Sequence, residues 1–194
     1  MIRFRLPNAP QDYLREWANA FTRAIEDGFN QIAATFNTTF LRTPSGYYGA
    51  FLDTTTQTAA VINTAYPINL GTTVEALGFS VTSGSRVNAV YAGTYNVQFA
   101  IQADKTTAGV GDIFVWLRLN GTNVASSAGK LAVQGSTAQT VAAWNYVLTL
   151  AAADYIELVW SASSTACRLL TIAAAAPVPA IPSMRVAVHQ VARP

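Results

Sequence analysis

The stretch Gly93-Thr94-Tyr95-Asn96-Val97-Gln98-Phe99-Ala100-Ile101-Gln102 decides the fold class of this chain. Its odd-numbered positions from 95 to 101 are apolar, whereas its even-numbered positions from 96 to 102 are small or polar. A period of two places alternate side chains on opposite faces of a β-strand. The stretch therefore predicts a long strand with one buried face and one exposed face.

Comparable short runs, rich in Thr, Val, Tyr, Ile and Trp and separated by Gly, Asn and Ser, fill the rest of residues 47–191. Asn120-Gly121 lies between two such runs and predicts a tight hairpin, because both residues tolerate positive φ. The run 154–161 does not alternate cleanly, which predicts burial on both faces. Short strands at this spacing favour an antiparallel sandwich, and a jelly roll in particular. The candidate strands are 47–52, 65–68, 74–81, 86–90, 93–102, 113–119, 122–125, 129–134, 139–150, 154–161 and 184–190.

Composition excludes several classes of protein. Of the 194 residues, 11% are charged and 51% are hydrophobic, and the net charge is +2. Charged residues usually make up about 25% of a globular chain, so this one is neither a disordered tail nor a nucleic-acid binder driven by a basic field. One Cys and one His are too few for a disulfide framework or for a metal site built from these ligands. No run approaches about 18 apolar residues and no signal peptide is visible at Met1, so we expect no membrane insertion.

Residues 1–42 differ from the remainder in charge density and in periodicity. They hold nine of the 22 charged residues, and the turn formers Thr43-Pro44-Ser45-Gly46 follow them. We therefore predict two regions, an arm and amphipathic helix over 1–42 and a β domain over 43–194. Apolar residues of the first region recur about every 3.7 positions, close to a straight α-helix and longer than the 3.5 of a left-handed coiled coil. They are Leu14, Trp17, Phe21, Ile25, Phe29, Ile32, Phe36 and Phe40.

A helix with one stripe of large apolar side chains cannot stand alone in water. Three partners remain open for the stripe: copies of the same helix, another protein, or the β domain itself. Gly28 weakens the helix by roughly 1 kcal/mol and marks a candidate break. The alternating segment 2–6 is either a frayed terminus or an arm that adds a strand to a partner's sheet. Six residues form the predicted seam of an anchor or stalk: Leu14, Trp17, Phe21, Ile25, Ile32 and Phe36.

No constellation of side chains in the sequence predicts catalysis. His189 has no nominated nucleophile or orienting acid, and Cys167 fits a small buried filler better than a nucleophile. Asp104 and Asp112 flank a Thr- and Gly-rich loop, but the alternating Asp and Asn of a calcium loop are absent. No glycine-rich phosphate loop leads from a strand into a helix. We expect no enzyme, no cofactor and no metal, and we take Asp104, Lys105 and Asp112 as a candidate recognition loop.

The order of motifs resembles the jelly roll of the tumour-necrosis-factor and complement-subunit family. The resemblance runs from Tyr47-Tyr48-Gly49-Ala50-Phe51, through the Gly-x-Tyr-x-apolar-x-aromatic strand at 93–99 and the strand ending in Asn120-Gly121, to the closing strand 184–191. It departs at Ala153, where the family has Gly before Asp154, and this puts that turn in doubt. Several short sequence motifs are also similar to those of small virion proteins of tailed bacteriophages. The shared motifs are Tyr-Gly-Ala-Phe-x-Asp-x-Thr-Thr-Gln (48–57), Trp-x-Arg-x-Asn-Gly-Thr (116–122), Ala-Trp-Asn-Tyr (143–146) and Pro182-Ser183.

The resemblance implies a homotrimer packed around an axis lined by aromatic residues. Tyr95 and Phe99 are candidates for this axis, although the core of one chain can equally claim them. The implied function is a short trimeric fibre or spike of a phage virion, assembled in the bacterial cytoplasm. Residues 1–42 then bind other virion proteins, and the loops of the knob contact a glycan or protein of the host surface. A capsid decoration or cement protein, a carbohydrate-binding module and a surface-polymer hydrolase remain as alternatives.

Overall fold

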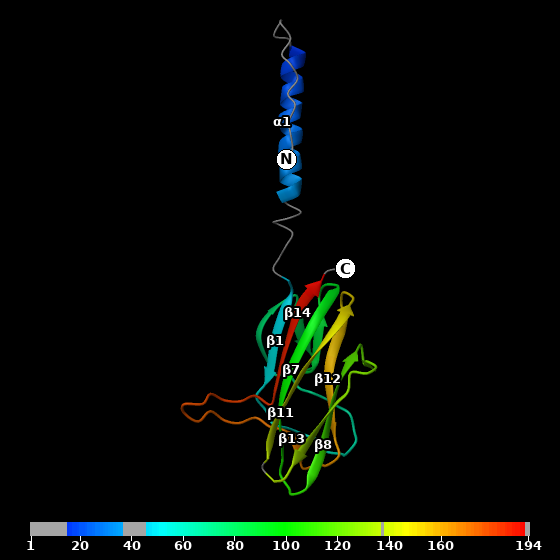
Figure 1. Ribbon diagram of the computed structural model, residues 1–194, viewed down its shortest axis with the longest axis vertical. Coiled ribbons are helices and arrows are strands. Elements are labelled where there is room, and N and C mark those ends of the chain that lie inside the picture. Colours follow the sequence, from blue (N-terminus) through cyan, green and yellow to red (C-terminus); the bar gives the residue numbers. More distant parts are fainter. Residues whose placement is uncertain (1–14, 37–45, 137, 193–194) are drawn as a thin grey trace. The chain divides into compact units, whose positions relative to one another are not determined.

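The computed structural model describes residues 15–36, 46–136 and 138–192, which belong to two compact units. The first unit contains the helix α1 (Arg15–Phe36), and the second, from Gly46 onward, is built of strands (Figure 1). The predicted boundary between residues 42 and 43 falls outside the described residues, as do Leu14 and Phe40.

Helix α1 continues through Gly28 without a break. The helix tolerates Gly28 because a single glycine reduces helix stability by only about 1 kcal/mol relative to Ala. Within the described part of the chain, no helix combines the length and the apolar character needed to cross a membrane.

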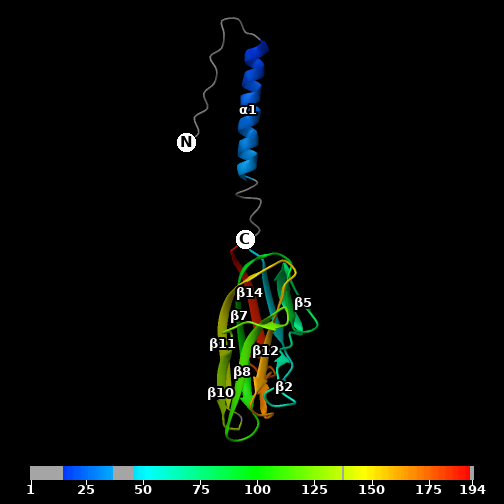
Figure 2. The ribbon, with the colours of Figure 1, turned by 90° about the vertical axis from the view of Figure 1, so that its right-hand side faces the viewer.

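The β unit consists of two antiparallel sheets. Figure 1 shows them edge-on, and Figure 2 looks onto the second sheet, with β8 and β12 in front. Sheet A contains β1 (Tyr48–Asp53), β2 (Gln57–Thr58), β4 (Thr72–Leu77), β7 (Gly93–Lys105), β11 (Gln139–Leu150), β13 (Cys167–Leu169) and β14 (Met184–Ala192). Sheet B contains β3 (Tyr66–Pro67), β5 (Phe79–Thr82), β6 (Arg86–Ala89), β8 (Val110–Leu119), β9 (Thr122–Asn123), β10 (Gly129–Gln134) and β12 (Tyr155–Ala162).

Strand pairing identifies the topology as a jelly roll. The main strands pair in a nested order, β1 with β14, β6 with β12, β7 with β11 and β8 with β10, so that early strands meet late ones. β14 also pairs with β7, and β12 with β8, which joins the nested pairs into two sheets. Two Greek keys wound into a double sheet are the definition of this architecture. The predicted fold class, an N-terminal helix followed by an antiparallel jelly roll, is confirmed.

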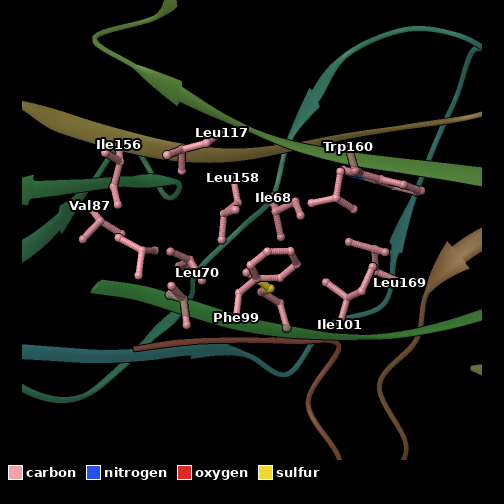
Figure 3. Packing of buried hydrophobic residues seen from close by; sticks show 14 of the residues in the cluster. Ile68, Leu70, Val87, Phe99, Ile101, Leu117, Ile156, Leu158, Trp160 and Leu169 are labelled. Carbon is pink, nitrogen blue, oxygen red and sulfur yellow. The ribbon is translucent and has the colours of Figure 1, made fainter. Parts of the chain in front are cut away.

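The deciding stretch forms the centre of the sandwich, as its alternation predicts. Its odd-numbered side chains from Tyr95 to Ile101 are at most 4% exposed, and they face the other sheet. Figure 3 shows Phe99 and Ile101 of β7 pointing toward Leu158 and Trp160 of β12. β12 is buried on both faces from Ile156 to Trp160, which confirms the interpretation of its irregular pattern.

The turn predicted at Asn120-Gly121 is confirmed, whereas a second turn, at Gly78, was not predicted. Asn120 and Gly121 have φ of 50° and 82°, as the Asn-Gly hairpin requires. The predicted strand 74–81 is instead two strands in different sheets, β4 in sheet A and β5 in sheet B. Gly78, with φ of 77°, lies between them and turns the chain from one sheet to the other. The two- and three-residue strands β2 and β13 were not predicted, because they are too short to show a period.

Candidate functional site

The outer face of sheet A is the surface of the β unit best suited to contact another protein. Two pairs of alanines oppose each other across its strands, Ala50 with Ala187 and Ala100 with Ala143. Their short side chains leave a groove of about 560 Å³, which we call the alanine groove. Arg185 is the charged residue among those that line it.

Large apolar side chains border this groove. Val74 of β4, and Val141 and Val147 of β11, are between 56 and 64% exposed. Val74 itself lines the groove, and Val141 lines a smaller hollow beside it. Gln98, Asn145 and Arg185 line the groove as well, so this surface is largely apolar with a few polar groups. Such a surface is suited to a contact with another protein.

Sheet B has a mixed surface, with the exposed Val110 and two ion pairs. The Lys130 Nζ lies 2.8 Å from Asp112 Oδ2, and the Arg86 Nε lies 3.3 Å from Glu157 Oε1. The guanidinium of Arg86 also lies over the ring of Tyr155, 4.6 Å from its centroid. The Lys130–Asp112 pair is exposed and stabilises the fold little, whereas the Glu157 side chain is only 7% exposed. Sheet A also holds an ion pair, between Asp104 and Arg168, so its distinguishing feature is the alanine groove and not an absence of charge.

The Ala-Trp-Asn-Tyr motif supports the groove from below. Ala143 and Asn145 line it, whereas the ring of Trp144 packs edge-on against Phe99 with centroids 4.6 Å apart. The Trp144 Nε1 donates to Tyr146 Oη at 2.7 Å, and Tyr146 Oη donates to the Ser127 carbonyl at 2.6 Å. Burial raises the pKa of Tyr146. This relay satisfies both polar atoms and holds β11 on the core.

Both residues predicted to line a trimer axis lie inside a single chain. Tyr95 is fully buried, donates its hydroxyl to the Tyr91 carbonyl at 2.8 Å and packs edge-on against Phe79. Burial raises the pKa of Tyr95. Phe99 is 4% exposed beneath Trp144. The axis role is therefore corrected, because side chains facing the opposite sheet cannot reach another copy.

The predicted recognition loop is also corrected, because two of its three residues are buried. Asp104 accepts hydrogen bonds from Nε and Nη2 of Arg168, which raise the pKa of that guanidinium. The Lys105 ammonium donates to the carbonyls of Thr107 and Ala108 and so holds the loop from inside. Asp112 is paired with Lys130 on sheet B. Asp104 and Lys105 are therefore buried and stabilise the structure around the loop, whereas Asp112 is partly exposed.

The described part of the predicted seam lies on α1. Phe21 is half-buried, whereas Ile25 and Ile32 are 40 and 59% exposed. Phe29, on the same stripe, is 68% exposed. Trp17 and Phe36 lie within α1, but their side chains are outside the described set, and Leu14 is outside the described residues altogether. The seam stays a prediction.

The remaining candidate residues, Cys167 and His189, do not lie in a common site. Cys167 is buried beside Lys105 and Gly111, and burial raises the pKa of its thiol, which suits a packed side chain. His189 is exposed on β14, opposite Asn96. Among the described residues, no three His, Cys, Asp or Glu side chains gather where they could hold a metal ion.

Sequence reasoning missed the alanine groove. The alternation of 93–102 placed Ala100 on the polar face of its strand, but no local signal showed that four alanines meet. The register between strands brings them together, and register depends on long-range pairing.

No protein-family model matches the chain, and no curated protein matches it. Solved structures with a remote likeness include murine APRIL at pH 5.0, at 10% identity and a TM-score of 0.48 over 75% of this chain and 99% of that one. Another is the globular domain of a zebrafish complement 1qA protein, at 12% identity and a TM-score of 0.46 over 77% and 99%. The jelly-roll assignment rests on the strand pairing of this chain and not on these likenesses.

Proposed function

We propose that this chain is a homotrimeric structural protein of a tailed-bacteriophage virion, in the form of a short fibre or spike. Residues 1–42 attach it to other virion proteins, and residues 43–194 form a distal knob. The observation that carries the assembly part is the alanine groove on the outer face of sheet A, together with the exposed valines Val74, Val141 and Val147 of the same sheet.

A homotrimer would remove the apolar face of sheet A from water in all three copies at once. Contacts between non-identical patches close into a ring when the rotation between copies is one third of a turn. The family resemblance of the sequence supports three as the number.

The exposed apolar stripe of α1 supports the attachment role. Ile25, Phe29 and Ile32 would be covered by neighbouring helices or by another virion protein. The phage setting and the virion location draw their support from the motifs at 48–57 and 116–122. Three identical knobs would strengthen weak contacts of their loops with a host surface through multivalency.

The molar mass in solution tests the assembly part. We expect light scattering to give three times 20.7 kDa for the full chain. Residues 43–194 should also be trimeric, because the proposed contact lies on sheet A. A monomeric full chain at micromolar concentration would overturn the homotrimer.

Immunogold labelling of particles from a lysate tests the virion part. Label at the tail or baseplate is expected for a fibre or spike, and label spread regularly over the head would favour the decoration protein instead. Particles without label, together with glycan binding by the isolated chain, would overturn the virion role in favour of a carbohydrate-binding module.

A further inference from the structure

The connection between β13 and β14 forms a projecting hairpin, to which the proposed function assigns no role. Two bridges hold it, Ile172 with Ile181 and Ala175 with Val178. No charged residue occurs between Arg168 and Arg185. In Figure 1 the hairpin, drawn in orange, extends sideways past sheet A, on the side away from β8 and β12. We call residues 171–182 the apolar arm.

The outer part of the arm is exposed, whereas Ile172 and Ile181 at its base are half-buried and Pro182 is buried. Every residue from 173 to 180 is exposed, and Val178 near its tip is 53% exposed. A two-stranded hairpin on its own is marginally stable in water, and this one is held by two short bridges. An uncharged projection of this length therefore points to a contact that covers it.

The base of the arm places it on the same side of the molecule as the alanine groove. Ile181 and Pro182 line a hollow of about 200 Å³ together with Ala100, Val141 and Arg185, which lie on the outer face of sheet A. Ala100 and Arg185 also line the alanine groove. From this base the arm extends away from its own sheet, so its tip is directed toward whatever faces sheet A.

We propose that the apolar arm of one copy packs into the alanine groove of a neighbouring copy. The arm is uncharged and the groove is largely apolar, and the small side chains of the groove leave room for a strand-like segment. Arg185 offers guanidinium donors to arm carbonyls that lose water on burial. Because arm and groove are different patches of the same chain, each copy gives one arm and receives one, and a rotation of one third of a turn between copies closes the contact into a ring of three. The inference rests on the proposed homo-oligomer and names the contact that joins its copies.

Cross-linking between two differently tagged full-length chains tests the contact. In a Cys167→Ala background, one chain carries Val178→Cys and the other carries Ala143→Cys, and the two are co-expressed. Oxidation or a short bismaleimide should join the two tags into one covalent species. Ala132, exposed on β10 of sheet B, is the matched control position, and Ala132→Cys should give no such species. Equal cross-linking at the control position would overturn the proposal.

A charge at the arm tip provides a second test that needs no cysteine. Val178→Asp places a charge in a buried contact, so it should weaken the oligomer. The protein concentration at which half of the oligomer is dissociated should rise by about tenfold or more. Val110 is 58% exposed on β8 of sheet B, and Val110→Asp is the matched control. The β-sheet circular dichroism of both variants should match the wild type.

The outcomes separate this inference from the function on which it rests. A trimeric full chain without the cross-link, or with equal dissociation of the Val178→Asp and Val110→Asp variants, overturns the arm contact and leaves the trimer standing. A monomeric full chain overturns both. A cross-link to another virion protein and none between the two tags would assign the arm to a different partner and overturn the proposal as well.

Discussion

Replacing Arg168 with Met removes the partner of a buried carboxylate. Arg168 on β13 lies directly across from Asp104 on β7, and its Nε donates to Asp104 Oδ1 at 2.8 Å. Its Nη2 donates to the other carboxylate oxygen. The side chain of Asp104 is 5% exposed and that of Arg168 is 31% exposed. Met keeps most of the aliphatic stem but leaves the carboxylate without its two charge-assisted hydrogen bonds.

The expected loss follows from this burial. Removing one member of a buried ion pair costs about 3–5 kcal/mol, because the other charge is left uncompensated. The partial exposure of Arg168 admits water and screening, so we expect about 2–3 kcal/mol for Arg168→Met. Adding Asp104→Asn removes the stranded charge and should bring the loss back to about 1 kcal/mol. The two substitutions should therefore be coupled by more than about 1 kcal/mol in a double-mutant cycle.

Urea unfolding of the full chain at one fixed protein concentration, followed by tryptophan fluorescence, measures these differences. With a slope of about 2 kcal/mol per molar urea, the midpoint of Arg168→Met should fall by about 1 M. Lys130→Met breaks the exposed pair with Asp112 and is the control, with an expected loss below about 1 kcal/mol. A stability of Arg168→Met equal to that of Lys130→Met, or a double variant less stable than Arg168→Met alone, would refute the reasoning.

Three further variants test packing, a turn and the helix. Gly111→Ala places a methyl group against Cys167 Sγ and 3.0 Å from Lys105 Cδ, so it should lower the free energy of unfolding by about 1–3 kcal/mol. Adding Cys167→Ala should recover part of that loss in the same urea assay. Ala153 has φ of 69°, and Ala153→Gly should raise the thermal midpoint by relieving about 1 kcal/mol of backbone strain; a lowered midpoint would contradict this. Phe21→Asp should abolish attachment through the helix in a particle-binding assay and leave the circular dichroism of the β unit unchanged, whereas loss of β structure would mean that the helix belongs to the core of the domain.

The turn at Ala153 shows how a structure can keep a feature that its sequence puts in doubt. The family pattern has Gly at this position, and the substitution by Ala predicted a disturbed turn. The turn forms nevertheless, because Asp154 accepts hydrogen bonds from the Ala151 amide at 2.7 Å and from Asn120 Nδ2 at 2.8 Å. Asn120 in turn accepts from the Tyr155 amide, so two turns stabilise each other across the end of the sandwich.

Misplaced site residues have a common physical cause. The sequence indicated that Tyr95 and Phe99 share one face of a strand, but both the core and an axis between copies demand apolar side chains. For Asp104 and Lys105, a Thr- and Gly-rich context predicted an exposed loop. Their partners, Arg168 and the loop carbonyls, become neighbours only through the pairing of β13 with β7 and the closing of the loop.

The class of the fold, most strand positions, the Asn-Gly hairpin and the helical character of α1 could be predicted from the amino-acid sequence. All of these are local properties, because alternation, turn chemistry and helical period act over a few neighbouring residues. Two features became visible only in the folded chain: four alanines from β1, β7, β11 and β14 meet in one groove, and an uncharged arm extends from the same side of the sandwich. These features depend on strand register and on the assignment of strands to sheets, which are set by pairings between residues far apart in the chain.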